Sequence, residues 1–254
     1  MSLVRLDLTE RVAWITLDRP PVNVLNIEML RELGSVLDEV AKNEEASVAV
    51  IGAAAGAKAF CAGVDVADHT PDKLASMLEV FHSALKKLAR LPQATVAALQ
   101  GAALGGGLEV ALVCDIAIAS TRAKLGQPEI RLACFPPVAL AALPKISGRV
   151  ATADIILTGD AVDAQRAKEI GLVSRVLPAE EFDSALREVV AGLAERSPSV
   201  LRLTTSLLRR QWVDDFEEAL GLAERCYLDD LAQQPDMAEG IAAFMEKRQP
   251  VWAS

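Results

Sequence analysis

The sequence predicts an α/β fold that is followed by a helical C-terminal extension. Up to about residue 120, short apolar segments alternate with segments of helical periodicity, and from about Ala151 onward the pattern is helical and poor in strand formers. Such alternation is typical of strand–helix–strand units with right-handed crossovers. The composition agrees, because 52% of the 254 residues are hydrophobic and can form a sizeable core.

The elements follow in order along the chain. The first strand is expected at residues 12–17 (VAWITL), which end at the turn signal DRPP. Asn26 is the expected N-cap of a helix, because apolar residues recur behind it from Ile27 to Val40 at helical spacing. Further strands are expected at 47–53, 95–101 and 115–120, helices at 74–91 and 104–113, and a loop at 54–68.

Composition and charge argue against several classes of protein. The formal net charge is −9 and no basic run exceeds two residues, whereas a duplex-binding surface needs clustered Lys and Arg. The longest apolar region, around 91–113, contains Gln100, four glycines and Glu109, which argues against a membrane span. We therefore expect no nucleic-acid and no membrane partner.

The cysteine and histidine content points to a reducing compartment. The four cysteines lie far apart without a CxxC pair and no secretory signal is recognisable, so we expect reduced thiols and a cytoplasmic location. His69 and His82 are the only histidines, which argues against a zinc site or a Ser–His–Asp triad.

Three loops, each following an expected strand, contain the candidate catalytic and binding groups. In the first, GAKAFCAGVDV (56–66), Gly63 indicates a tight backbone at which the Val64 amide could face a ligand; an ordinary glycine turn is the alternative. In the second, Gly105–Gly107 would form the first helical turn, where N–H groups lack partners, with Glu109 beside them. A purely structural explanation fits equally well: the glycines would allow close packing of the helix on the sheet, and an acidic residue such as Glu109 is favoured near the start of a helix.

The third loop, LGQPEIRLACFPP (125–137), places Glu129 twenty residues beyond Glu109, although an exposed loop carboxylate would look the same. Taken together, the loops supply two backbone donors and two carboxylates at strand ends. Donors aimed at a developing enolate oxygen lower a barrier by several kcal/mol, and two carboxylates can hold a water and move its proton. These groups suit the addition of water to a double bond conjugated to a carbonyl.

Five ordered motifs resemble the crotonase (enoyl-CoA hydratase/isomerase) superfamily over nearly the whole chain. They are LDRPPVNVLN at the N-terminal CoA site, KAFCAGVDV in the first oxyanion loop, GAALGGGLEVALVCDIAIAS in the central signature, LGQPEIRL in the second catalytic loop and EGIAAFMEKRQPVW in the C-terminal tail.

The resemblance implies a role for each matching residue. The backbone N–H groups of Val64 and Gly106 would form the oxyanion hole, and Glu109 and Glu129 would be the catalytic pair, with their individual roles open. The residues that would line the CoA and substrate channel are Ala62, Gly63, Val64, Asp65, Val66 and Gly106. The substrate would be an acyl-CoA thioester, and no metal, flavin or nicotinamide cofactor is implied.

The resemblance also implies an architecture and an assembly. Residues 1–192 would form a crotonase-like core of repeated ββα units arranged as a spiral, and residues 193–254 a helical trimerisation region. A homotrimer or a hexamer is therefore expected. An enoyl-CoA isomerase and a non-catalytic acyl-CoA-binding or RNA-binding scaffold remain alternatives to a hydratase.

One motif departs from the family pattern. Where most family hydratases have a glycine-rich turn after the second glutamate, this chain has Phe135-Pro136-Pro137, and two rigid prolines should reshape the wall of the acyl pocket. This form resembles cyclohexa-1,5-diene-1-carbonyl-CoA hydratases. An ordinary hydratase with a variant loop is the alternative, so the acyl group could be a linear enoyl or a cyclic dienoyl chain.

Overall fold

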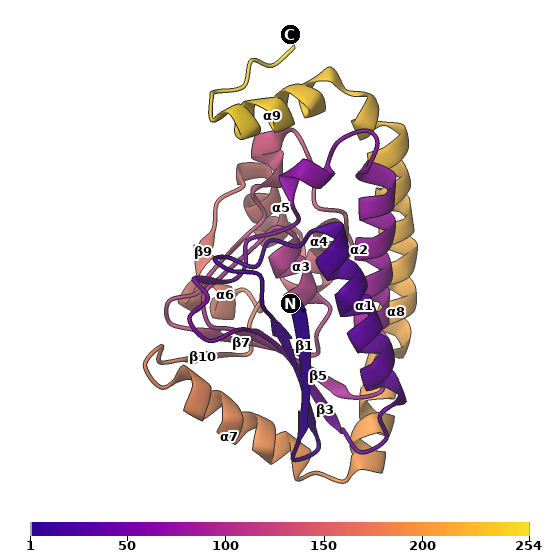
Figure 1. The fold of residues 1–254 in the computed structure, drawn as a ribbon, viewed down its shortest axis with the longest axis vertical. Helices are drawn as coiled ribbons and strands as arrows, with labels where there is room; N and C mark the ends of the chain where they lie inside the picture. The colour runs from indigo at the N-terminus through magenta and orange to yellow at the C-terminus, as the bar shows by residue number, and fades with distance from the viewer. Residues whose placement is uncertain (1, 254) are drawn as a thin grey trace.

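A repeated strand–strand–helix unit builds the core of the protein, whose computed structural model describes residues 2–253 (Figure 1). In three consecutive repeats the first strand enters a six-stranded sheet and the second enters a four-stranded sheet. The six-stranded sheet has the order β1 (Val4–Thr9), β2 (Val12–Leu17), β3 (Val48–Ala53), β5 (Ala94–Leu99), β7 (Ile116–Ser120) and β10 (Arg175–Leu177). The four-stranded sheet has the order β4 (Ala59–Cys61), β6 (Ala102–Leu104), β8 (Lys124–Gly126) and β9 (Val162–Asp163). The predicted α/β class with ββα repeats is confirmed.

The expected strands are present with small shifts at their ends. β2, β3, β5 and β7 occupy the expected segments and pair in parallel, while β1 is antiparallel to β2. Every residue of β5 is buried, as expected for a central strand covered on both faces. The segments expected as loops contain the short strands β4 and β8, and the segment after β5 contains β6. A strand of three residues is too short to show a periodic pattern.

Helices cover both faces of the larger sheet. The helices are α1 (Ile27–Lys42), α2 (Leu74–Ala89), α3 (Gly106–Leu112), α4 (Pro137–Ile146), α5 (Gly148–Thr158), α6 (Ala164–Glu169), α7 (Phe182–Ala194), α8 (Pro198–Asp229) and α9 (Pro235–Glu246), with 3₁₀ turns η1 (Val66–Asp68), η2 (Pro128–Leu132) and η3 (Leu231–Gln233). In Figure 1, α1, α2 and the long α8 run side by side, and α7 lies across the opposite face of the sheet. The expected N-cap is confirmed, because the Asn26 side chain accepts a hydrogen bond from the Met29 N–H at 3.0 Å.

The last third of the chain is less uniformly helical than expected. Helix begins at Pro137 rather than near Ala151, and the strands β9 and β10 interrupt the helices that follow. Strands of two and three residues again leave no periodic signal. Helix α8 packs against α2, α4 and β5, and its buried Val213, Phe216 and Leu220 belong to the main core cluster. The division into domains at residues 192/193 stays a prediction. None of the helices within residues 2–253 combines the length and low polarity that a bilayer crossing needs.

Candidate active site

The smaller sheet brings the three candidate loops to one edge. β4, β6 and β8 are parallel neighbours, and Val64, Gly106 and Glu129 each follow one of these strands. Because the carboxyl ends of parallel strands meet at one edge, residues distant in sequence converge there. They line a cavity of about 330 Å³, to which α2, α8 and α9 also contribute side chains.

Two backbone N–H groups face this cavity without a partner. Gly106 is the first residue of α3, so its N–H has no intrahelical acceptor. On either side of Val64, the Gly63 carbonyl accepts from Leu25 at 2.8 Å and the Asp65 N–H donates to Leu25 at 2.9 Å. Within residues 2–253 the Val64 N–H itself makes no hydrogen bond. A Cβ added to Gly106 would lie 3.3 Å from the Val64 amide nitrogen, so the two donors are close neighbours.

Both predicted glutamates line the same cavity. Glu109, in the first turn of α3, is only 2% exposed, and its Oε1 accepts a hydrogen bond from the Ala139 N–H at 2.8 Å. Ala139 lies in the first turn of α4, where N–H groups are free to bind an anion. Glu129, in η2, approaches so closely that a Cβ on Gly105 would lie 2.5 Å from its Oε1.

Burial controls the ionisation of the pair. Desolvation raises the pKa of Glu109 to about 7, and hydrogen bonds from the N–H groups of Ala139 and Val138 limit this rise by stabilising the carboxylate. Desolvation also raises the pKa of Glu129 well above its usual value, and the charge on Glu109 raises it further. Because the charge of Glu109 adds to desolvation at Glu129, we expect Glu109 to be the carboxyl that ionises first and Glu129 the one that keeps its proton.

The side-chain amide of Gln127 lies next to the carboxyl group of Glu129. Its side chain is fully buried, and with its amide nitrogen turned toward the carboxyl it donates to both oxygens of Glu129 at 3.1 Å. The sequence motif LGQPEIRL contains this residue, but nothing in the local pattern marks its amide as a neighbour of the carboxyl.

The predicted binding residues are largely brought together. The cavity lining includes the predicted residues Ala62, Gly63, Val64, Val66, Gly106, Glu109 and Glu129. Asp65 is not part of this lining: its carboxylate forms an ion pair with Arg19 at 3.2 Å and caps η1 by accepting from the Ala67 N–H at 3.2 Å. The binding role assigned to Asp65 stays a prediction.

Several lining residues have no local motif that could have indicated them. Phe81 from α2, Phe135 before α4 and Tyr227 from α8 add aromatic rings to the lining, and the rings of Phe135 and Tyr227 pack edge to face with their centroids 5.0 Å apart. Tyr227 is the only tyrosine of the chain and is 2% exposed. It follows Glu109 by more than one hundred residues, so only the tertiary fold relates the two.

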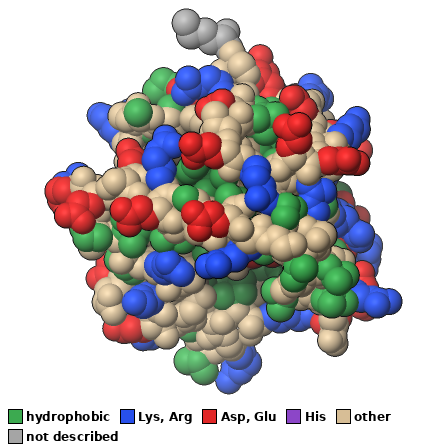
Figure 2. Space-filling model, turned by 90° about the horizontal axis from the view of Figure 1, so that it is seen from below, with side chains coloured by type: hydrophobic (Ala, Val, Ile, Leu, Met, Phe, Trp, Pro, Cys, Tyr) green, Lys and Arg blue, Asp and Glu red, His purple; other side chains and the backbone are tan. Residues whose placement is uncertain are grey.

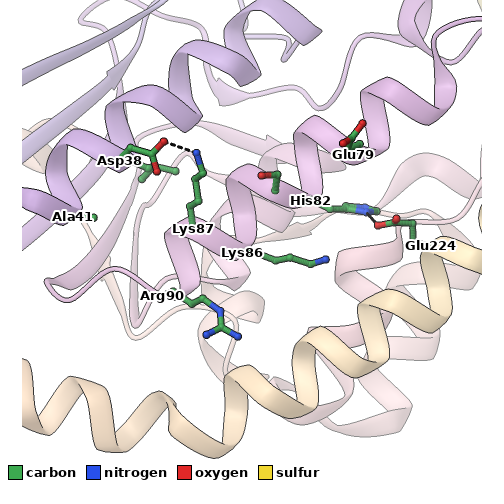
Figure 3. Close-up of a pocket in the computed structure, with 10 residues that line it drawn as sticks. Asp38, Ala41, Glu79, His82, Lys86, Lys87, Arg90 and Glu224 are labelled. Atoms are coloured by element: carbon green, nitrogen blue, oxygen red, sulfur yellow. Dashed lines mark hydrogen bonds and ion pairs between the residues drawn. The ribbon is translucent and has the colours of Figure 1, made fainter.

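A second groove, between α1, α2 and α8, is lined by charged side chains, but they are not arranged like the groups that line the first cavity (Figure 3). Lys87 pairs with Asp38 at 2.5 Å, and His82 Nδ1 lies 2.5 Å from Glu224 Oε2. These pairs join α2 to α1 and α8, which indicates a structural contact between helices. The face in Figure 2 likewise shows acidic and basic side chains intermixed. Among residues 2–253, no group of three His, Cys, Asp or Glu side chains is arranged to hold a metal ion.

Comparisons with known proteins agree with this geometry. The profile of the Enoyl-CoA hydratase/isomerase family matches residues 7–254. A probable enoyl-CoA hydratase of Mycobacterium bovis is 35% identical over 250 residues, covering 97% of this chain and 96% of the relative. A cyclohexa-1,5-dienecarbonyl-CoA hydratase of Thauera aromatica is 33% identical over 251 residues, covering 99% and 93%. A short-chain-enoyl-CoA hydratase of Clostridium acetobutylicum is 30% identical over 256 residues, covering 98% and 96%. The crystal structure of an enoyl-CoA hydratase from Mycobacterium avium subsp. paratuberculosis superposes with a TM-score of 0.90 at 25% identity, covering 100% of both chains.

Proposed function

Because the chain belongs to the enoyl-CoA hydratase/isomerase family, we propose that it is a hydratase that adds water to an α,β-unsaturated acyl-CoA thioester. The observation that carries this proposal is the pair of carboxyl groups, buried Glu109 and half-buried Glu129, beside the two free N–H groups of Val64 and Gly106. Moving a double bond needs one acid–base group, whereas adding water across it needs a group for the water and a proton source for the carbon.

The thioester oxygen binds between the two backbone N–H groups. Val64 and Gly106 donate to it and stabilise the negative charge that it gains as the enolate forms. The donors are held by β4, β6 and α3 before the substrate arrives, so little reorganisation is needed during the reaction. Hydrogen bonding to the thioester oxygen withdraws electron density from the β-carbon, which makes that carbon more reactive toward water.

The two glutamates take different roles in the proposed mechanism. Ionised Glu109, held by the α4 N–H groups, accepts a proton from the bound water as the water oxygen bonds to the β-carbon. Protonated Glu129 gives its proton to the α-carbon, and the enolate collapses back to a thioester. Water is thereby added across the double bond, and transfer of one proton from Glu109 to Glu129 restores the starting state.

For the acyl group we propose a cyclic dienoyl thioester, with a linear short-chain enoyl thioester as the second candidate. Pro136 and Pro137 lead into α4 and bring Phe135 against Tyr227, which gives the inner cavity a rigid aromatic wall suited to a planar ring. The Thauera aromatica relative is named for the cyclic substrate and the Clostridium acetobutylicum relative for the short-chain one.

The test compares hydration of crotonyl-CoA and cyclohexa-1,5-diene-1-carbonyl-CoA, followed by loss of the enoyl-thioester absorbance. We expect a higher kcat/KM with the cyclic substrate; a strong preference for crotonyl-CoA would remove the cyclic assignment and leave the hydratase. The double variant Glu109→Gln, Glu129→Gln should be inactive with both, and full activity would contradict the roles given to the glutamates.

The isotope content of the product separates hydration from isomerisation. In ¹⁸O-water, the product of a hydratase gains the label in its new hydroxyl group. A product that has the mass of the substrate and no label would identify an isomerase. No turnover of either thioester, with butyryl-CoA still bound, would indicate a non-catalytic acyl-CoA-binding protein. We also propose a cytoplasmic location, which suits the four unpaired thiols.

A further inference from the structure

His69 lines the substrate cavity and is not used by the proposed mechanism. It follows the 3₁₀ turn η1, on the same short segment as the oxyanion donor Val64. Of the other residues that line the cavity, Glu109, Phe81 and Tyr227 are almost fully buried, whereas His69 and Val66 are half-buried, as Glu129 and Phe135 are. His69 is therefore more accessible than Glu109, as expected for a residue beside the part of a thioester that leads out of the cavity.

A hydrogen bond determines which ring nitrogen carries the proton. Nδ1 lies 3.0 Å from the backbone oxygen of Asp65. A carbonyl oxygen can only accept, so Nδ1 is the donor, and in the neutral ring Nε2 presents a lone pair. Within residues 2–253 this Nε2 has no hydrogen-bond partner, and in contrast to Nε2 of His82 it is not sealed from solvent.

The charge state favours an acceptor at this position. Burial lowers the pKa of His69, although the nearby carboxylates of Asp65 and Asp68 act in the opposite direction. Each of those carboxylates has its own cation, Arg19 for Asp65 and Lys73 for Asp68. The ring is therefore neutral near pH 7, and Nε2 accepts hydrogen bonds.

The segment that holds His69 is also well anchored. The Asp68 carboxylate accepts from the Ile27 N–H at 3.1 Å at the start of α1, and the His69 N–H donates to Val66 at 3.1 Å. These hydrogen bonds tie the turn to α1 and to itself, so the imidazole is held on the cavity wall that Val64 also lines. The direction of the Nε2 lone pair is therefore set before a ligand binds.

A ligand at this position must offer an N–H or O–H donor. The thioester oxygen is an acceptor, a simple enoyl chain has no donor, and the water of the proposed mechanism is bound at Glu109 instead. In an acyl-CoA, the first donor beyond the sulfur is the amide N–H of the pantetheine arm. We propose that His69 Nε2 accepts a hydrogen bond from this amide N–H and so positions the thioester against Val64 and Gly106. This inference rests on the proposed acyl-CoA substrate.

The test combines substitutions of His69 with truncation of the substrate. Crotonyl-CoA and crotonyl-N-acetylcysteamine contain the amide next to the sulfur, whereas S-butyl crotonothioate contains no amide. His69→Leu should lower kcat/KM about five- to tenfold with the first two, mainly through KM, and leave the third unchanged. His69→Gln, which keeps an acceptor, should recover most of the loss. The control Glu129→Gln should lower kcat by a similar factor with all three.

Two results would overturn the role of His69. An equal loss with all three thioesters would mean that the imidazole only supports the fold or the chemistry, and a loss confined to crotonyl-CoA would place the donor farther along the cofactor. Calorimetry with butyryl-CoA, which cannot be hydrated, keeps the test separate from the proposed activity. His69→Leu should weaken that binding five- to tenfold even if the wild-type chain hydrates none of the thioesters.

Discussion

At the residue scale, the three consecutive glycines are needed for three different reasons. Gly105 has a φ of +52° and no room for a Cβ beside Glu129. A Cβ on Gly106 would lie 2.7 Å from a methyl group of Val64, and a Cβ on Gly107 would collide with the backbone of Cys61. The run therefore reflects close packing of the oxyanion loop, α3 and Glu129.

The first prediction concerns Gly105. Gly105→Ala should displace Glu129 and strain the backbone, so we expect kcat to fall at least ~100-fold, because small displacements in a catalytic site carry costs of that order. Gly192→Ala in α7 is the matched control: its Cβ meets nothing within 4 Å, so it should stabilise the helix by ~0.5–1 kcal/mol without changing kcat. Steady-state kinetics and urea unfolding test both. Unchanged kcat in Gly105→Ala would contradict the close packing.

The second prediction is the pH dependence of activity. The mechanism needs Glu109 ionised and Glu129 protonated. Activity should rise with pH through about 7 as Glu109 ionises, and fall at higher pH as Glu129 loses its proton. A bell-shaped profile of kcat/KM is expected. In Glu109→Gln the rising limb should disappear from any residual activity; its persistence would assign that limb to another group.

The third prediction links the same carboxyl to stability. The folded-state pKa of Glu109 is raised from 4.5 to about 7, so between these values the folded chain holds a proton that the unfolded chain has released. The free energy of unfolding therefore falls as pH rises through this window. Glu109→Gln should stabilise the protein by about 3 kcal/mol at pH 8 and by little at pH 4. Urea unfolding at both pH values tests this, and an equal effect at both would contradict the shifted pKa.

At the element scale, helix starts and short strands build the site. The first turn of α4 directs its Ala139 N–H at Glu109, and the strands β4, β6 and β8 align three loops that are far apart in sequence. The longest helix, α8, is joined to the core by Arg209, whose guanidinium donates to Asp115 and to backbone oxygens of Leu91 and Gln93. Since α8 also supplies Tyr227, this attachment supports the cavity wall.

The fourth prediction tests that attachment. Arg209→Met would leave the carboxylate of Asp115 without its cation, and because the Asp115 side chain is 20% exposed, we expect a loss below the ~3–5 kcal/mol of a fully buried pair. Arg122→Ala is the control, because the Arg122–Glu180 pair is exposed and contributes less than ~1 kcal/mol. The double variant Arg209→Met, Asp115→Asn should regain part of the loss. Equal stability of the Arg209 and Arg122 variants would show that the pair does not hold α8.

At the scale of the whole molecule, the isolated chain leaves large apolar side chains in water. On α8, Leu203, Leu207 and Leu208 are 63%, 64% and 73% exposed, and on α5 Val150 is 75% exposed. Exposed apolar surface of this kind marks an interaction site. We propose that copies of this chain cover it in the trimer or hexamer expected from the family resemblance.

The fifth prediction follows from this surface. Light scattering should give a mass three or six times the 27.0 kDa of one chain. Leu207→Glu should lower that mass, because a carboxylate in an apolar interface loses its hydration, whereas Arg122→Ala should leave it unchanged. A monomeric wild-type protein would contradict the proposed assembly.

The long helices and strands, and the convergence of Glu109 and Glu129 on one cavity, could be predicted from the sequence alone. The strand Val12–Leu17 and the helix behind Asn26 are recognisable because apolar residues repeat along each segment with the period of a strand or of a helix. The triple glycine is recognisable because it indicates a constraint on the backbone at consecutive residues. Features that depend on distant contacts could not be predicted: the three-residue strands, the place of Tyr227 in the cavity wall, and the hydrogen bond from the Ala139 N–H to Glu109. A local pattern records the periodicity of a segment, whereas burial and hydrogen bonding depend on segments that only folding brings together.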